Sequence, residues 1–566
     1  MNWRIIAVIS FFGILYSFLL FTIFNIQIEK HKEYLVLAGN QNIVDGLLPA
    51  RRGVIYFTDK SGNKTPAVLN KEYPELFAVP LEIQKSFVAS PDELAAAITD
   101  TANTLSSIIG IPASEIDAKL HKKNDQYELL AEKLTGDMVR EIKTRNLTGI
   151  YIKDTTSRFY PFKTIASHIL GFVSPANETE SKKVGNALLG RYGVELYFNA
   201  ELSGLPGRVE GDHITESKSG SDIVLTIDPT IQGEAEEILE KLVEAYKAKG
   251  GSVIVAEPKT GKILAMGSSP DFDPNTYSKF AIGTFLNPAV EAVYEPGSIA
   301  KVLTMAAGID AKKITPETKY YDTGTFTANG KTISNWDLKA VGPHGWQTMA
   351  DVIDDSINTG AVFAQRQMGS TIFSNYFRAF GLGTATNITL PGEVNGNLHN
   401  LQNGKDIDYA TASYGQGISV TPLALIGAIS AIANGGTLMK PYIIASEKPQ
   451  IVDRVMSEVT AKKVKDMMVS AVFKNKLAVI PGYTIAAKTG TAFVPNFGGK
   501  GYTNDVINSY IGFGPASDPK FIILLKLDKP EGSPLAGQTV VPAFHELAQY
   551  IINYLNIPPD NLNPKS

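Results

Sequence analysis

The segment Tyr294-Glu-Pro-Gly-Ser-Ile-Ala-Lys301 places a serine and a lysine three residues apart, directly before the apolar run Val302-Leu-Thr-Met-Ala306. That run predicts a buried helix beginning near Ser298. Residues three apart lie on one face of a helix, so the hydroxyl of Ser298 and the amine of Lys301 are expected side by side at the start of the helix. This spacing predicts a serine nucleophile with an amine base beside it.

Two further short motifs follow in a fixed order, Ser356-Ile-Asn358 and then Lys488-Thr-Gly-Thr491. Each is weak alone, because the chain also holds Ser61-Gly-Asn-Lys64 and Lys259-Thr-Gly261 by chance. The second of these chance matches precedes the candidate nucleophile and lies in turn-forming sequence between two apolar runs. The order and the surroundings of the three motifs therefore predict one site.

The chemistry requires a lysine that is neutral near pH 7. A serine hydroxyl becomes a good nucleophile only when a neighbouring base takes its proton, and lysine can be that base only if its pKa falls well below about 10.4. Two positive charges about 4 Å apart repel by roughly 4 kcal/mol at an effective dielectric constant near 20. Lys488 is the second cation expected to lower the pKa of Lys301 in this way.

The ordered set S-x-x-K, S-x-N and K-T-G resembles the signature of the active-serine penicillin-recognising enzymes. The wider resemblance is to the class B (monofunctional) penicillin-binding proteins, and it covers nearly the whole chain. The further stretches that carry it are Leu48-Pro-Ala-Arg-Arg-Gly-Val-Ile55, Arg158-Phe-Tyr-Pro161, His168-Ile-Leu-Gly-Phe172, Gly190-Arg-Tyr-Gly-Val-Glu195, Phe380-Gly-Leu-Gly383, Leu390-Pro-Gly-Glu393 and Tyr414-Gly-Gln-Gly417.

The resemblance implies a serine-type peptidoglycan D,D-transpeptidase, an acyltransferase that β-lactams inhibit covalently. In the family pattern Ser298 is the nucleophile and Lys301 its base. Ser356 carries the proton between the lysines and the leaving amine, Asn358 orients substrate and Lys301, and Lys488 is the second lysine. These five residues are the expected catalytic residues.

In the same family pattern, the third motif binds the substrate. Thr489 and Thr491 are expected to recognise the substrate carboxylate, and Gly490 to let the substrate backbone approach closely. The backbone N–H groups of Ser298 and Thr491 are expected to form the oxyanion hole.

The composition narrows the remaining possibilities. The chain has 566 residues, 44% of them hydrophobic, which is enough for more than one domain with its own core. A net charge of −4 argues against a nucleic-acid partner, and the absence of cysteine excludes disulfides and a thiolate nucleophile. The acidic residues show no metal-ligand clustering, so neither a metal nor another cofactor is implied.

A membrane anchor is expected at residues 1–28, followed by a polar stalk at residues 29–46. Residues 5–28 carry no charge, and as a helix they would span about 36 Å, more than a hydrocarbon core of roughly 30 Å. The alternative is a cleaved signal peptide, whose apolar region is normally shorter, about 7–15 residues. With the resemblance, this predicts a single-pass protein of the inner or plasma membrane whose bulk is extracytoplasmic.

The rest of the chain is expected to be α+β. Residues 47–220 form an irregular mixed domain without catalytic residues, a dimerisation or pedestal domain by resemblance, in which Arg51, Arg52 and Glu195 are interpreted as structural charges. Residues 221–557 form the transpeptidase domain, and residues 558–566 a disordered tail. The resemblance implies an antiparallel five-stranded sheet flanked by helices, similar to the serine β-lactamases.

Sequence patterns locate elements at both ends of the transpeptidase domain. A strand is predicted at residues 223–227, a helix starting at Asp228-Pro229, and a hairpin at residues 252–256 and 262–267. A second hairpin is predicted at residues 509–514 and 521–527, and a closing amphipathic helix at residues 541–555.

Two other functions stay open. One is hydrolysis, as in a D,D-carboxypeptidase or a β-lactamase, although Glu393 lies in a stretch that resembles class B enzymes instead of a deacylating motif. The other is a β-lactam sensor or scaffold that is acylated without turnover. By resemblance, the expected partners are D-Ala-D-Ala stem peptides, β-lactams and a membrane glycan polymerase of the shape, elongation, division and sporulation family. A role in division or in elongation is left open.

Overall fold

The structure is a computed structural model. It describes residues 47–48, 50–86, 91–177, 180, 188–210, 213–476, 478–496, 498–532 and 535–561, together with positions 3, 12–13, 15–18 and 22. In these parts no helix has both the length and the apolarity to cross a membrane. Apart from those few early positions, the predicted anchor and stalk lie outside the described residues.

Residues 68–161 form one compact unit, and the rest of the chain forms the other. In the smaller unit, β3 (Lys64–Ala78) pairs antiparallel with β4 (Glu128–Ala131) and β5 (Ile150–Phe159). Its helices are α3 (Pro80–Ser86), α4 (Pro91–Ile109), α5 (Ala113–Leu120) and α6 (Gly136–Arg145). Leu76, Leu105 and Leu120 lie in the core of this unit.

The first part of the larger unit is made of short elements. They are β1 (Leu47–Leu48), β2 (Ile55–Thr58), α7 (Ser167–Leu170), β6 (Val173–Pro175), β7 (Leu188–Gly190), α9 (Gly193–Tyr197), α10 (Asn199–Ser203), β8 (Gly207–Glu210), β9 (His213–Thr215) and β10 (Ile223–Val224). A buried ion pair joins Arg52 to Glu195, with Arg52 Nε donating to the Glu195 carboxylate at 2.7 Å. This pair confirms the structural interpretation of both charges.

A five-stranded antiparallel sheet lies at the centre of the larger unit, as the resemblance implied. Its order is β12-β11-β21-β20-β19. The strands are β11 (Gly250–Glu257), β12 (Lys262–Ser269), β19 (Ala486–Pro495), β20 (Tyr502–Gly514) and β21 (Phe521–Asp528). The pairs β11–β12 and β20–β21 confirm both predicted hairpins.

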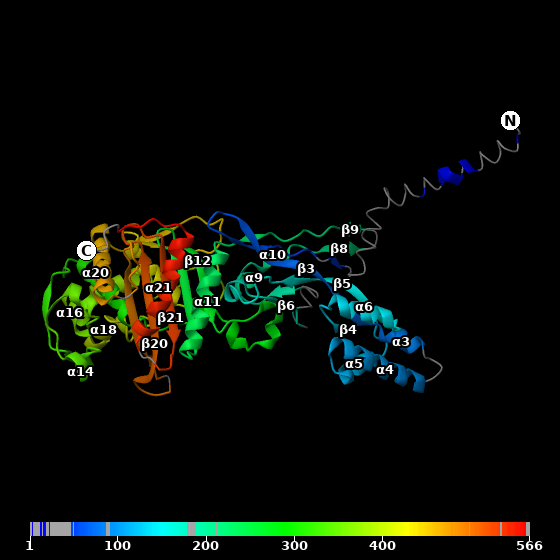
Figure 1. Cartoon of the computed structure of the whole chain (residues 1–566), viewed down its shortest axis with the longest axis horizontal. Helices are drawn as coiled ribbons and strands as arrows, with labels where there is room; N and C mark the ends of the chain where they lie inside the picture. Colours follow the sequence, from blue (N-terminus) through cyan, green and yellow to red (C-terminus); the bar gives the residue numbers. More distant parts are fainter. Residues whose placement is uncertain are drawn as a thin grey trace. The chain divides into compact units, whose positions relative to one another are not determined.

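Helices α11 (Pro229–Ala245) and α21 (Ala536–Tyr554) pack on this sheet and on each other (Figure 1). Asp228 accepts hydrogen bonds from the N–H groups of Thr230 and Ile231, and Pro229 occupies the first turn, so α11 begins where the sequence predicted. Leu239, Leu525 and Phe544 meet in the shared core. The predicted strand at 223–227 is shorter than expected, because only Ile223 and Val224 pair as β10.

The middle of the unit is mostly helical. Its elements are η3 (Pro274–Lys279), η4 (Ile282–Phe285), α12 (Pro288–Glu291), η5 (Gly297–Ile299), α13 (Ala300–Asp310), β13 (Lys319–Asp322), β14 (Thr325–Ala328), β15 (Lys331–Ser334), α14 (Leu338–Val341), β16 (Gly345–Thr348), α15 (Met349–Asp354), α16 (Asn358–Met368), α17 (Ser370–Ala379), η6 (His399–Leu401), α18 (Asp406–Ala412), α19 (Pro422–Ala433), β17 (Thr437–Met439), β18 (Ile451–Arg454) and α20 (Glu458–Asn475). Helix α13 is buried on every side, as the apolar run after Lys301 predicted.

The start of the expected tail is held in place. Asp560 accepts a hydrogen bond from the N–H of Thr484 at 2.7 Å and another from the hydroxyl of Ser517 at 2.8 Å. Residues 558–561 therefore differ from the disordered tail that the sequence indicated, because a carboxylate near the end finds partners in loops at the sheet. Residues 562–566 lie outside the described residues. The division predicted at residue 220 stays a prediction.

Candidate active site

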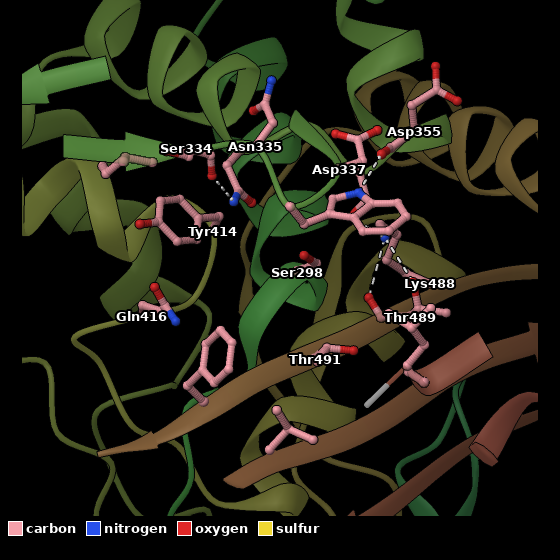
Figure 2. A pocket seen from close by; sticks show the side chains of 18 of the residues that line it. Ser298, Ser334, Asn335, Asp337, Asp355, Tyr414, Gln416, Lys488, Thr489 and Thr491 are labelled. Carbon is pink, nitrogen blue, oxygen red and sulfur yellow. Dashed lines mark hydrogen bonds between the residues drawn. The ribbon is translucent and has the colours of Figure 1, made fainter. Parts of the chain in front are cut away.

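The three motifs line one groove of about 1330 Å³. Figure 2 shows Ser298, Lys488, Thr489 and Thr491 around it, and Ser356 and Asn358 also belong to its lining. Lys301 lies beneath this surface, with none of its area exposed. The structure thus brings together the serines, lysines and threonines that the sequence placed in one site.

Ser298 lies in the single 3₁₀ turn η5, directly before α13, and its side chain points into the groove (Figure 2). Gly297 before it has φ +56°, a conformation that favours glycine. A Cβ at Gly297 would lie 2.7 Å from the carbonyl oxygen of Thr491. The missing side chain therefore lets the turn of the serine lie directly against strand β19.

One hydroxyl joins the two lysines. Lys301 Nζ donates to Ser356 Oγ at 3.2 Å and also to the carbonyl oxygen of Ser356. Lys488 Nζ lies 2.9 Å from the same Oγ. Ser298 and Lys301 come from η5 and α13, Ser356 from the turn between α15 and α16, and Lys488 from β19. Three segments far apart in sequence thus meet at one serine hydroxyl.

Both lysines have lowered pKa values. Burial lowers the pKa of Lys301 well below its usual range, and the charge of Lys488 lowers it further. Burial also lowers the pKa of Lys488 to about 8, although the nearby charge of Asp354 opposes this effect. The sequence correctly indicated a lowered pKa for Lys301 and correctly named Lys488 as a contributor. Burial is nevertheless the larger cause, because the helix that carries Lys301 is enclosed on all sides.

Ser356 has an unusual backbone. Its φ is +56°, in the left-handed region that a side chain with a Cβ rarely adopts. Such a conformation costs about 1–2 kcal/mol and persists only where the surrounding structure enforces it. Here the carbonyl and the hydroxyl of the same residue both face Lys301. In this conformation both groups are directed toward one amine.

Strand β19 carries the third motif along the edge of the sheet. Thr489, Thr491 and Phe493 alternate along it and all line the groove. Gly490 faces the other way, because a Cβ there would lie 2.4 Å from Ser509 Oγ and 2.8 Å from the carbonyl oxygen of Pro296. Gly490 therefore packs against the serine turn, and the close approach of substrate that the resemblance implied stays a prediction.

Asn358 lies at the first turn of α16 and lines the groove. Its Nδ2 donates to the carbonyl oxygen of Ser334 at 2.8 Å. This bond joins α16 to the end of β15. In this structure the amide is directed to Ser334, whereas the resemblance implied that it would orient Lys301.

A segment that the sequence did not single out forms one wall of the groove. Asn335, Trp336, Asp337 and His344 all line it, and Trp336 is 62% exposed. The Trp336 indole donates to the carbonyl oxygen of Asp355 at 3.2 Å, one residue before Ser356. An exposed tryptophan in a polar loop was the available signal. His344 Nε2 lies 3.1 Å from the carboxylate of Asp337.

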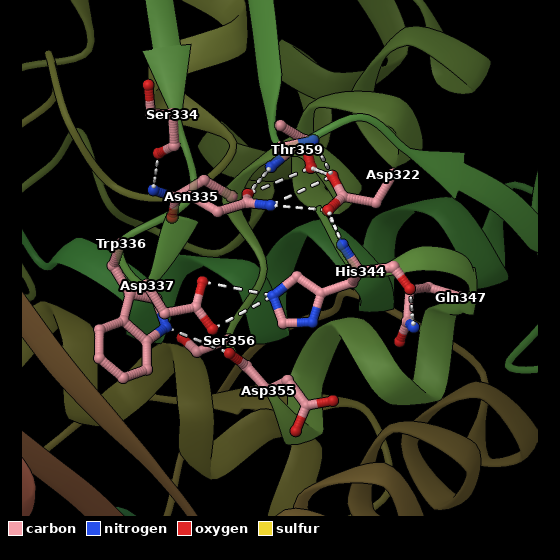
Figure 3. Close-up of polar contacts among 12 residues, drawn as sticks. Asp322, Ser334, Asn335, Trp336, Asp337, His344, Gln347, Asp355, Ser356 and Thr359 are labelled. Carbon is pink, nitrogen blue, oxygen red and sulfur yellow. Dashed lines mark hydrogen bonds and ion pairs between the residues drawn. The ribbon is translucent and has the colours of Figure 1, made fainter. Parts of the chain in front are cut away.

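Asp322 holds this wall in place (Figure 3). Its buried carboxylate accepts hydrogen bonds from Asn335 Nδ2 at 2.9 Å, from the N–H of His344 at 2.9 Å and from the hydroxyl of Thr359. Burial alone would raise the pKa of Asp322, but these hydrogen bonds hold it below its usual value. Because Thr359 follows Asn358, one carboxylate connects the second motif to the wall.

The patterns set aside in the sequence lie elsewhere. Lys259 is in the turn between β11 and β12 and pairs with Asp518. His168 is buried beneath Thr284, and burial lowers its pKa to about 4, which suits a structural residue. Within the described residues, no group of acidic or histidine side chains could hold a metal ion.

Comparisons with known proteins agree with this geometry. Residues 251–549 match the penicillin binding protein transpeptidase domain, and residues 47–245 match the penicillin-binding protein dimerisation domain. The chain is 31% identical to stage V sporulation protein D of Bacillus subtilis, over 85% of this chain and 75% of that protein. It is 29% identical to peptidoglycan D,D-transpeptidase FtsI of Escherichia coli K12, over 90% and 85% of the two chains.

Solved structures agree as well. Penicillin-binding protein 2X from Streptococcus thermophilus matches with a TM-score of 0.71 and 25% identity, over 90% of this chain and 81% of that one. A peptidoglycan synthetase from Bifidobacterium adolescentis matches with a TM-score of 0.68 and 27% identity, over 92% and 98%. With both domains matched in order and the three motifs gathered in one groove, the chain belongs to the class B penicillin-binding protein transpeptidases.

Proposed function

We propose that this chain cross-links peptidoglycan stem peptides through an acyl-enzyme formed on Ser298. The observation that carries this proposal is the hydroxyl of Ser356, shared by two buried lysines at 3.2 and 2.9 Å. An enclosed amine with a lowered pKa beside a serine is the arrangement that activates a hydroxyl. The two lysines and the hydroxyl form a continuous route for the proton.

The first step forms the acyl-enzyme. The Ser298 hydroxyl gives its proton to neutral Lys301 while its oxygen attacks the carbonyl carbon of the penultimate D-Ala. The backbone N–H groups of Ser298 and Thr491 stabilise the oxyanion. In enzymes of this kind, removal of one such donor typically lowers the rate about 10²–10³-fold. As the amide bond breaks, Ser356 passes the proton from Lys301 to the departing amine of the terminal D-Ala, leaving an ester on Ser298.

The second step transfers the acyl group. An amine from a neighbouring stem peptide attacks the ester carbonyl, and its proton leaves by the same route through Ser356. The new amide bond is the cross-link, and the proton that returns to Ser298 restores the free hydroxyl. Thr489 and Thr491 hold the substrate carboxylate on the edge of β19, with the charge of Lys488 next to them, and Asn358 contacts the substrate backbone.

The structure around Glu393 favours acyl transfer over hydrolysis as the second step. Glu393, the glutamate weighed as a possible deacylating residue, accepts hydrogen bonds from the N–H groups of Thr386 and Asn387 at 2.7 and 2.8 Å. It thereby closes a loop and is not among the residues that line the groove in the described part of the chain. A carboxylate that activates water would have to face the ester on Ser298.

We also propose that residues 5–28 anchor the chain in the inner or plasma membrane and that the catalytic unit lies on the extracytoplasmic side. The support is the uncharged run of residues in the sequence. A membrane glycan polymerase is the expected partner, contacted through the anchor and the N-terminal domain. Exchanging residues 1–46 for an unrelated single-span anchor should keep the protein in the membrane fraction and remove co-purification of the polymerase. Co-purification that survives the exchange would contradict this contact.

The first test is covalent labelling of the full chain with a fluorescent penicillin, in wild type, Ser298→Ala and Lys301→Ala. Stable label on wild type that both variants lose supports the proposal. Label that disappears within minutes indicates a hydrolase, and label retained in Ser298→Ala refutes the assignment of the nucleophile. Formation of a cross-linked dimer from stem-peptide substrate separates a transferase from a sensor.

A further inference from the structure

Glu295 lies three residues before Ser298, where three segments of the groove meet. Its Oε1 accepts a hydrogen bond from the N–H of Gly417 at 3.0 Å and another from the hydroxyl of Tyr502 at 3.3 Å. Gly417 and Tyr502 both line the groove. Gly417 belongs to the segment after α18, and Tyr502 is the first residue of β20. One carboxylate oxygen thus contacts both neighbours of the serine turn.

The other oxygen of Glu295 is unusual. Oε2 is buried and has no hydrogen-bond partner among the described residues. Burial raises the pKa of Glu295 to about 7, and the hydrogen bonds from Gly417 and Tyr502 oppose that rise. A buried carboxylate oxygen without a partner is costly. Packing alone would be served equally well by an apolar side chain, so the carboxylate needs another explanation.

Backbone contacts hold one side of the serine turn. Gly297 donates to the carbonyl oxygen of Gly415 at 3.2 Å, and Tyr294 and Val420 exchange two hydrogen bonds at 3.0 and 2.9 Å. A Cβ at Gly415 would lie 2.1 Å from the carbonyl oxygen of Gly297, so these two segments are in direct contact. The turn is therefore already joined to the segment that contains Gly417.

The other side depends on side chains. Tyr502 pairs with Pro495 at the far end of the β19–β20 hairpin, beyond a register shift that follows Phe493. The hydrogen bond from Tyr502 to Glu295 links this end of the hairpin to the serine turn. Since Thr491 lies on the same hairpin as Tyr502, the position of the hairpin sets the distance between Thr491 and Ser298.

We propose that Glu295 is a positioning residue for acyl transfer, whose carboxylate holds Tyr502 and the Gly417 segment against the turn that carries Ser298. This inference rests on the proposed function of Ser298. Glu295 acts through the elements it joins and does not itself exchange a proton with the substrate. Its effect is on how well the two N–H donors of the oxyanion hole are aligned.

The ionisation of Glu295 matters for this link. Hydrogen bonds to a charged acceptor are roughly twice as strong as neutral ones, so the link is strongest above pH 7 and weakens as Glu295 is protonated below it. Two titratable groups face the carboxylate, Tyr414 and Tyr502. Burial, with the charge of Glu295 adding to it, raises the pKa of each phenol, so both remain neutral near pH 7.

The test measures the second-order rate constant for acylation of the full chain by a fluorescent penicillin between pH 6 and 9. The variants are Glu295→Ala, Glu295→Gln and Tyr502→Phe. Glu291→Gln is the matched control, because Glu291 is a half-buried glutamate on the neighbouring α12 with a raised pKa caused by burial, and it is not a groove-lining residue in the described chain. Melting temperatures are recorded for all variants.

We expect Glu295→Ala to lower the rate constant at pH 8 about tenfold, which corresponds to about 1.4 kcal/mol, and Tyr502→Phe to lower it about threefold. Glu295→Gln still accepts both hydrogen bonds and should recover most of the activity. The ratio of wild type to Glu295→Gln should be largest at pH 8–9 and approach one at pH 6. Lys301 titrates in both proteins, so its contribution cancels from this ratio. The control should match wild type.

A ratio that stays constant from pH 6 to 9, or a rate constant for Glu295→Ala equal to that of wild type, overturns the proposal. If Glu295→Ala does not fold, the pH dependence of Glu295→Gln and the rate of Tyr502→Phe decide instead. Ser298→Ala distinguishes a failure of the proposed function from a failure of the positioning role of Glu295. Label that persists in Ser298→Ala refutes the proposed function, whereas label lost only there, with all Glu295 variants active, refutes the positioning role alone.

Discussion

Substituting Ser356 by alanine and by glycine separates its chemical role from its backbone strain. Both substitutions remove the hydroxyl that joins Lys301 and Lys488. Only glycine also removes the Cβ that makes a φ of +56° unfavourable. We therefore expect the two variants to lose acylation equally and to differ in stability.

The magnitudes follow from the geometry. A residue with a Cβ in the left-handed region lowers the stability of the folded protein by about 1–2 kcal/mol. Glycine lowers it by about 0.4–1 kcal/mol relative to alanine, because the unfolded chain is more flexible with glycine. Ser356→Gly should thus be more stable than Ser356→Ala by about 0.5–1 kcal/mol. A positioned proton carrier typically contributes about 10²–10⁴ in rate, so both variants should be acylated at least about a hundredfold more slowly than wild type.

Two measurements on the full chain test these expectations. Acylation by a fluorescent penicillin gives the rate constant at pH 7.5, and thermal unfolding gives the order of stability of the two variants. A rate constant within tenfold of wild type in either variant would show that the proton does not travel through Ser356. A melting temperature for Ser356→Gly at or below that of Ser356→Ala would show that the backbone is not strained at this position.

Three further predictions concern buried titratable groups. Glu195→Ala leaves the buried guanidinium of Arg52 without its carboxylate and should destabilise the protein by about 3–5 kcal/mol in thermal unfolding; a loss below about 1 kcal/mol would contradict the buried ion pair. Lys301→Met should abolish penicillin labelling and raise the melting temperature, because the folded state no longer forces an amine to lose its proton. That gain should shrink as the pH rises toward the ordinary pKa of lysine, and a gain independent of pH would refute it. Asp322→Ala removes the acceptor shared by Asn335, His344 and Thr359, and it should lower the stability of the protein by about 2–3 kcal/mol and slow acylation. Unchanged acylation rates would show that this wall does not contribute to acylation.

The parts of the fold that sequence reasoning predicted are those determined by local pattern. Asp228 and Pro229 start α11 because a side-chain cap and a proline at the first turn act within one helical turn. The β11–β12 and β20–β21 hairpins follow from apolar runs separated by short turn segments. In the site, the order of the motifs was enough to predict that Ser298 and Lys488 lie in one groove.

The parts that could not be predicted depend on contacts between distant segments. Nothing near Ser356 in the sequence indicates a positive φ, and the amine that its carbonyl contacts belongs to Lys301, 55 residues earlier. The wall around Trp336 enters the groove through the carboxylate of Asp322, which collects donors from three later segments. The packing of Gly490 against Pro296 could not be predicted, because Pro296 lies on another element.

The same contacts explain why catalysis and folding are coupled in this unit. The pKa of Lys301 is lowered because α13 is enclosed, and the turn η5 directly before α13 lies directly on β19. That approach requires Gly297 and Gly490 to lack side chains, since each Cβ would meet the opposing backbone within 3.0 Å. A change that separates these backbones would therefore admit water to Lys301 and restore its charge before it altered any residue that touches the substrate. The nucleophile is activated by how closely a helix and a strand are packed.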